Sequence, residues 1–291
     1  DVDGSGRMYV ASWKHCKFNF SGPNVGFVVQ VTPTGFVPKP FPVLSEETDE
    51  QLVGHLASPS AVYRMHSQLE LLRRGAGEDR IERVARLAAD TKAMAHSRAA
   101  AVFTLGQFDD KSVVSRLLQL VSLDGVREFA LRMLTDRRGR LKSVPTGPVL
   151  AGLKDPNPRV RAQALISLGR LARPETASAI LPLTRRAAKP PAATPTLHKQ
   201  PDPDRVIPHL AVRALVAVGN VDVLLKGLDG PDHDGAQWAL KSIHGRKAVD
   251  GLIAKLSTQR DDTRRQATLT TLVRLYHREG DYTGDWWGTR P

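Results

Sequence analysis

Four arginines recur at one position of a repeated sequence pattern, and their charge makes them the first candidates for binding an anion. They are Arg98, Arg127, Arg161 and Arg265, each three residues before a small residue that opens an apolar pattern. A guanidinium is permanently charged and donates in a planar fork that matches phosphate or carboxylate oxygens. We therefore expect a ladder of arginines along a stack of helices. Each either contacts a phosphate of a bound nucleic acid or pairs with the acidic turn of its own repeat, as Arg161 would with Asp155.

A second candidate group is aromatic and lies at the C-terminal end of the chain. It contains Tyr276, Tyr282, Trp286 and Trp287 within 12 residues. Such a cluster can form a stacking platform for a sugar, which makes Trp286 and Trp287 candidate binding residues. It can also fold over the last repeat and cover the apolar end that a helical stack exposes. We favour this second interpretation.

Other chemistry finds little support in the sequence. The chain has no Gly-rich phosphate loop, no Gly-x-Ser-x-Gly and no His-Glu-x-x-His, and Cys16 is its only cysteine. The Asp1-Val2-Asp3-Gly4 start lacks the glutamate that a calcium loop needs at its twelfth position, so both aspartates are expected to bond their own backbone. In the polar cluster after Pro231, Asp232 or Asp234 is expected to cap a helix. We therefore predict no catalytic residue, metal or cofactor.

The elements that position the arginines are helix pairs, and residues 152–171 show the pattern best. A short helix ends near Lys154, because Pro156 and Pro158 cannot continue it. Asp155 or Asn157 can then cap a second helix. The second helix carries an apolar stripe at helical spacing, formed by Val160, Ala164, Leu165, Leu168 and Leu171. One pair cannot bury this stripe alone, so the pattern predicts stacked neighbours of the same kind.

The same pattern recurs along the chain. Taking Ala164-Leu165-x-x-Leu168 as the anchor, further copies begin at Gln68, Ala101, Ala130, Ala214, Ala239 and Thr268. Successive copies are 25–34 residues apart, except for the 50 residues between Ala164 and Ala214. These units resemble HEAT-like repeats, particularly the short variety of bilin lyases. The fold that we predict is a right-handed α-solenoid of about seven HEAT-like helix pairs with a small N-terminal β appendage.

The predicted organisation has three parts. Residues 1–44 form a β-rich appendage, with a strand after the first turn, a second at 26–32 and a third near Phe36-Val37. Residues 45–276 form the repeats, and Ser58 with Pro59 is expected to start one of their helices. The long spacing is explained by a Pro-rich insert at 187–206, and residues 277–291 form the aromatic tail.

The two ends of the chain resemble parts of larger proteins. Asp-x-Asp-Gly-x-Gly-x-Met-Tyr-Val at the start resembles the last blade of a β-propeller, and Asp285-Trp286-Trp287-Gly288 resembles the segment that leaves the last repeat. The resemblance is to bacterial proteins with a glucose/sorbosone-dehydrogenase-like propeller, HEAT-like repeats and a c-type cytochrome domain. It implies that this chain is a piece of a longer periplasmic or extracellular protein. The resemblance does not imply that this segment itself has the catalytic activity of such a protein.

The basic net charge is compatible with two classes of function. The net charge is +12, and no run of 18 apolar residues predicts a membrane span. The basic charge either keeps the helix surfaces soluble or holds nucleic acid or another anionic polymer, as in the HEAT-like solenoids of DNA glycosylases. The function that we predict is a non-catalytic scaffold that binds a protein partner or neighbouring domains of its parent chain. The alternative is a nucleic-acid-binding solenoid with a basic concave face.

Overall fold

The computed structural model describes residues 1–14, 22–186 and 203–278, which belong to two compact units, Asp1–Met133 and Leu134–Pro291. Three predicted features lie wholly or mostly outside the described residues. They are Cys16, the Pro-rich insert up to residue 202, and the aromatic tail with Trp286 and Trp287.

The first unit begins with a two-stranded antiparallel sheet. Strand β1 (Met8–Trp13) pairs with β2 (Gly26–Val31) so that Met8 lies opposite Val31. The turn before β1 is held as predicted, because the Asp3 carboxylate accepts hydrogen bonds from the backbone N–H groups of Ser5 and Arg7. The prediction of a third strand near Phe36 was wrong. Prolines on both sides of that position lack the N–H that a strand needs for pairing.

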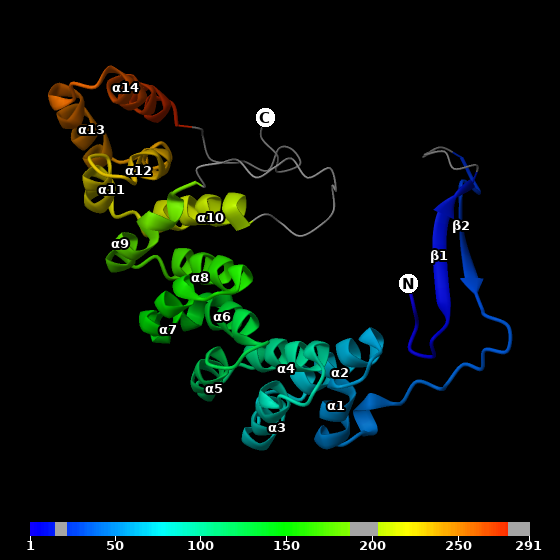
Figure 1. Ribbon diagram of the computed structural model, residues 1–291. Helices are drawn as coiled ribbons and strands as arrows, with labels where there is room; N and C mark the ends of the chain where they lie inside the picture. The colour runs from blue at the N-terminus through cyan, green and yellow to red at the C-terminus, as the bar shows by residue number, and fades with distance from the viewer. Residues whose placement is uncertain (15–21, 187–202, 279–291) are drawn as a thin grey trace. The chain divides into compact units, whose positions relative to one another are not determined.

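From residue 44 onward the first unit is built of helices (Figure 1). The helices are η2 (Leu44–Glu46), α1 (Asp49–Leu56), α2 (Ala61–Arg73), α3 (Glu78–Ala89), α4 (Ala95–Gln107), α5 (Ser112–Val121) and α6 (Arg127–Asp136), the last of which continues into the second unit. Thr48 and Gln51 form a capping box at the start of α1. The cap predicted at Ser58 was two residues early, since Ser60 is the N-cap of α2 and Ser58 Oγ accepts from the Ser60 N–H.

The second unit continues the series of helices. They are η3 (Arg138–Ser143), α7 (Thr146–Ala151), η4 (Gly152–Lys154), α8 (Pro158–Leu171), η5 (Pro174–Thr176), α9 (Ala177–Ile180), η6 (Leu181–Thr184), α10 (Pro203–Val218), α11 (Val221–Gly227), α12 (His233–Leu240), α13 (Arg246–Thr258) and α14 (Asp262–Tyr276). The start of α8 follows the prediction, because Asn157 is its N-cap and Pro158 its first residue. Residues 203–206 of the predicted insert are helical.

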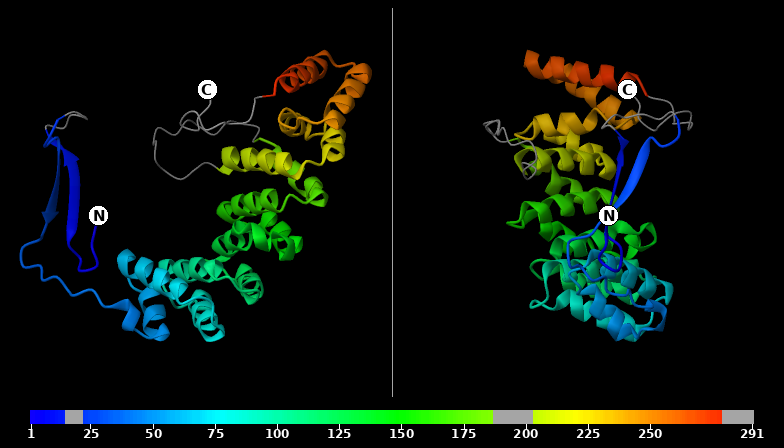
Figure 2. Two further views of the ribbon diagram at one scale, coloured as in Figure 1. Left: turned by 180° about the vertical axis from the view of Figure 1, so that it is seen from behind. Right: turned by 90° about the vertical axis from the view of Figure 1, so that its right-hand side faces the viewer.

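The α-helices follow one another as successive pairs, and the second helix of each pair carries the anchor residues. In the second unit α10 packs against both α8 and α12, and α8 and α10 lie side by side in Figure 1 and Figure 2. Four anchors have all three residues buried, namely those that begin at Ala101, Ala130, Ala164 and Ala214. The fold is therefore a mainly α repeat solenoid with a small two-stranded sheet.

The anchor of the first repeat was predicted one residue out of register. In α2 the buried positions are Ser67, Glu70 and Leu71, whereas Leu69 is 56% exposed. Ser67 therefore takes the place that Ala164 has in α8. This shift places Arg64 at the repeat position of the four predicted arginines.

Three glycines let neighbouring helices approach closely. Gly106 and Gly169 occupy the same repeat position, and a Cβ on Gly169 would lie 3.3 Å from the Cα of Ala214 in α10. At Gly235 in α12 a Cβ would overlap the side chain of Thr184 at the end of η6. At Gly169 the glycine lets the backbone of α10 approach closely, whereas at Gly106 and Gly235 it leaves space for the side chains of Met133 and Thr184.

A pair of glycine substitutions tests this packing. Gly235→Ala is expected to destabilise the second unit by about 1–3 kcal/mol, because the new methyl group has no space beside Thr184. Gly54→Ala in α1 is the control, since nothing lies within 4 Å of its Cβ position and alanine favours a helix by up to about 1 kcal/mol. Urea unfolding followed by circular dichroism measures both. A Gly235→Ala variant as stable as the wild type would contradict the packing.

An ion-pair network joins the first three helices. The Glu70 carboxylate accepts bonds of 2.7 Å from Arg73 and 2.8 Å from Arg74. Arg74 and Arg80 each donate to Asp49 at 2.9 Å, which connects α2 and α3 with the start of α1. The hydrogen bonds from Arg73, followed by those from Arg74, lower the pKa of Glu70 from 4.5 to about 2.

This pKa predicts how acid weakens the fold. Because the folded pKa lies below the unfolded one, the stabilisation by Glu70 is complete above about pH 4.5 and is lost as the pH falls towards 2. Glu70→Gln is expected to cost about 1–3 kcal/mol at pH 7 and to flatten the stability profile between pH 4.5 and 2. Glu78→Gln, at an exposed residue of α3, is the control. Parallel profiles for wild type and Glu70→Gln would contradict the assignment.

Candidate functional site

The arginine ladder bonds the backbone of its own repeats. Arg161 Nη1 donates to the carbonyl oxygens of Asp155 and Pro156 at 2.8 and 2.9 Å. Arg64 makes the same pair of bonds, to Ser58 at 2.7 Å and Pro59 at 2.8 Å. Each guanidinium thus reaches back to the turn before its own helix.

The other ladder arginines satisfy carbonyls at the end of the preceding helix. Arg98 is 8% exposed and its Nε donates to Ala88 at the end of α3 at 3.1 Å. Arg127 donates to Val121 at the end of α5 at 2.8 Å, and Arg265 donates to Leu256 in α13 at 2.9 Å. The last carbonyls of a helix lack partners within the helix, so these bonds supply what the helix ends need.

Arg161→Ala tests this structural role. Two turn carbonyls would lose their donor, so we expect a loss of about 1–3 kcal/mol and a lower melting temperature. Arg213→Ala, at an exposed residue of α10, is the matched control and should leave the melting temperature nearly unchanged. A ladder that instead serves a nucleic acid gives the reverse pattern: an unchanged melting temperature, and a log–log salt slope of duplex binding reduced by about one.

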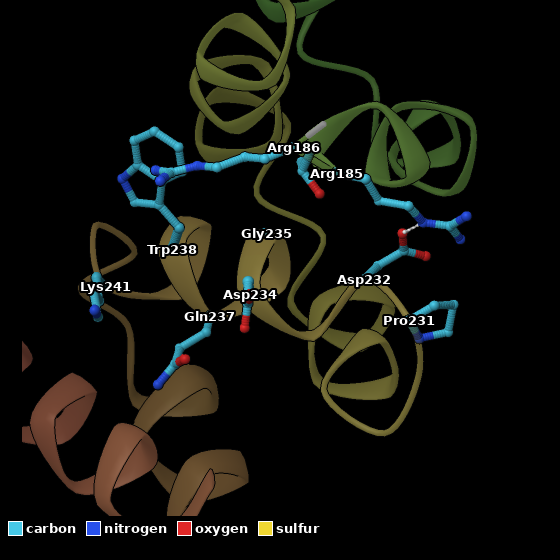
Figure 3. Close-up of a pocket in the computed structure, with 10 residues that line it drawn as sticks. Arg185, Arg186, Pro231, Asp232, Asp234, Gly235, Gln237, Trp238 and Lys241 are labelled. Carbon is cyan, nitrogen blue, oxygen red and sulfur yellow. Dashed lines mark hydrogen bonds and ion pairs between the residues drawn. The ribbon is translucent and has the colours of Figure 1, made fainter. Parts of the chain in front are cut away.

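A pocket of about 650 Å³ lies in the second unit, between the end of η6 and α12. We call it the Trp238 pocket. Its walls are Thr184, Arg185, Arg186, Pro231, Asp232, Asp234, Gly235, Gln237, Trp238 and Lys241 (Figure 3).

Two consecutive arginines of this pocket point in opposite directions (Figure 3). Arg185 Nε donates to Asp232 at 2.6 Å, and this bond, with the charge of Asp232, raises the pKa of Arg185. Arg186 extends the other way and places its guanidinium carbon 5.0 Å from the centroid of the Trp238 ring. The ring of His209 in α10 lies 5.9 Å from the same tryptophan.

The expected capping role of Asp232 or Asp234 was wrong. Asp232 is the N-cap of α12, but its side chain makes no capping bond and pairs with Arg185 instead. Asp234 lies inside the first turn and interacts with His233. Sequence reasoning missed the Trp238 pocket, because residues from separate segments form it. The signal in the sequence that could have indicated the pocket is the Arg185-Arg186 dipeptide, which directly follows an apolar helix.

A second candidate surface is the hairpin of β1 and β2. Every residue of the two strands except Tyr9 is exposed, and neither strand contains a charged residue. Val10 and Val29 share one face and are each 43% exposed. Trp13 and Val28 share the other face and are 45% and 69% exposed. Both faces of the sheet are therefore apolar and open.

The described residues offer neither a metal site nor a membrane-spanning helix. That part holds no group of three or more His, Cys, Asp or Glu side chains placed to bind a metal. Among the same residues, no helix combines the length and the hydrophobicity needed to span a bilayer.

Comparisons with known proteins identify a HEAT-like repeat segment. The model of the HEAT repeat family matches residues 147–173, which contain α8 and the turn before it. No curated protein matches the chain.

The similar solved structures are repeat proteins of low sequence identity. Importin beta is 14% identical, with a TM-score of 0.47 over 77% of this chain and 35% of its own. The CpcE–CpcF complex of phycocyanin lyase from Nostoc sp. PCC7120 is 15% identical, with a TM-score of 0.37 over 84% of this chain and 100% of its own. A designed armadillo repeat protein in complex with the peptide (KR)4 is 14% identical, with a TM-score of 0.30 over 78% and 100%. Because these TM-scores are low, the assignment of the fold is based on the helix packing and on the match to the HEAT repeat family.

Proposed function

We propose that the chain is a non-catalytic interaction scaffold, in which HEAT-like repeats follow a β hairpin that docks into neighbouring β structure of a larger, dehydrogenase-like protein. The observation that carries the proposal is the hairpin with two apolar, exposed faces. A two-stranded sheet is only marginally stable alone, and its unpaired edges invite further strands. A sheet that is apolar on both faces is suited to lie between two other layers.

The resemblance of the motif at residues 1–10 to the last blade of a propeller fits this requirement. A propeller arranges its sheets radially, so each sheet has a neighbour on both faces. In the parent, the hairpin would form part of such a blade, and the repeats would position the propeller against an electron-accepting domain. The periplasmic or extracellular location is part of the same proposal. A nucleic-acid partner gains no support from the ladder, because each of its guanidinium groups donates to at least one backbone carbonyl.

Hydrogen exchange tests the docking of the hairpin. In the isolated chain, we expect the amides of β1 and β2 to exchange rapidly, whereas those of α8 are protected. In the longest native polypeptide that contains this sequence, the amides of both strands should become protected by at least about tenfold. Equal exchange in the two polypeptides would contradict the docking, as would a native polypeptide without further β structure.

Turnover by the isolated chain tests the non-catalytic part. With sugars or alcohols and an artificial electron acceptor, we expect no rate above background. The control is the native polypeptide under the same conditions. Turnover by the chain alone would overturn the scaffold proposal and leave the docking of the hairpin as a separate question.

A further inference from the structure

We propose that the Trp238 pocket binds a carboxylate side chain of an acidic peptide segment in a protein partner. Its two contact residues are Arg186 and Lys241, and Trp238 holds the first of them in place. This inference concerns a different surface from the hairpin, so it stands independently of the proposed docking.

Arg186 is a positioned cation with open donors. Its guanidinium lies over the Trp238 ring at 5.0 Å, and among the described residues it has no hydrogen bond or ion pair. The ring attracts the cation through its quadrupole and restricts its motion, which lowers the entropy lost on binding a ligand. Because the contact with the ring engages no N–H group of Arg186 in a hydrogen bond, these groups can donate to a carboxylate in a bidentate manner.

Lys241 adds a second charge on the same side of α12. It lies three residues after Trp238, and residues at this spacing are neighbours on a helix surface. Figure 3 shows it on the Trp238 side of the pocket, away from the Arg185–Asp232 pair. It too makes no ion pair with a described residue. Two cations are therefore available, while Arg185 is neutralised by Asp232.

The other polar residues of the wall restrict the kind of anion that fits. Gln237 Nε2 donates to Thr271 Oγ1 of α14 at 3.2 Å, and Thr184 Oγ1 donates to Leu181, so both polar groups are already occupied. Asp232 and Asp234 also line the pocket. Because Asp232 is paired with Arg185, Asp234 is the wall carboxylate that repels a densely charged polyphosphate, whereas a single carboxylate can approach from the Arg186 side.

The volume of the pocket agrees with a peptide segment. At about 650 Å³ it lies within the usual range of about 300–1,000 Å³ for ligand sites and exceeds the size of a simple ion. A glutamate or aspartate side chain with its neighbouring backbone can fill such a space. The partner chemistry that we infer is therefore an acidic, extended stretch of protein.

Calorimetric titration with acetylated hexaglutamate tests the proposal. We expect binding to the wild-type chain below about 1 mM peptide and no binding of hexalysine. Arg186→Gln should weaken the binding about tenfold or more, since it removes a charge-assisted bond, and Lys241→Gln should weaken it less. Trp238→Leu should also weaken it, because Arg186 would then lack its support.

The controls separate this pocket from general attraction to a basic chain. Arg260→Gln and Lys226→Gln remove exposed charges of the same unit that do not line the pocket, and they should leave the affinity within about twofold. The proposal is overturned if hexaglutamate does not bind, if the control variants lose as much affinity as the pocket variants, or if a short DNA duplex competes and depends on Arg186 more strongly than the peptide does.

Discussion

The repeats depend on one constraint: the carbonyl oxygens at helix ends and turns need hydrogen-bond donors from outside their own helix. A chain of short helices has many such ends, and each leaves carbonyl oxygens without a partner in its own helix. Arginines at one repeat position supply the missing donors, as Arg98 does for the end of α3 and Arg161 does for the turn before α8. The spacing of these arginines therefore follows from the spacing of the turns.

The arginines consequently fall into two classes with different roles. Those of the ladder bond the backbone and stabilise it, although they form the most regular basic pattern in the sequence. Arg186 belongs to no repeat pattern, yet it is held over Trp238 and has no hydrogen bond to another residue that the structure describes. A net charge of +12 is thus a poor measure of the charge that a partner can reach.

Local sequence predicted the elements whose determinants are local. Asn157 and Pro158 fix the start of α8, and the apolar spacing fixes its buried face. The buried face of α2 could not be predicted in this way, because Leu69, Leu71 and Leu72 allow the repeat anchor to be placed in more than one register. The buried face contains Ser67, Glu70 and Leu71, and Glu70 is paired there with Arg73 and Arg74. The Trp238 pocket likewise depends on the close approach at Gly235, which no periodicity reveals.

Chemical modification of arginine is the most direct test of the division into two classes. Phenylglyoxal reacts with free guanidinium groups, and peptide mass spectrometry measures the rate at each arginine of the native chain. The account predicts that Arg98 and Arg161 react at least about tenfold more slowly than Arg186 and Arg260, because both donate to backbone carbonyls and Arg98 is also buried. Equal rates at all four residues would contradict the assignment of the ladder to helix ends.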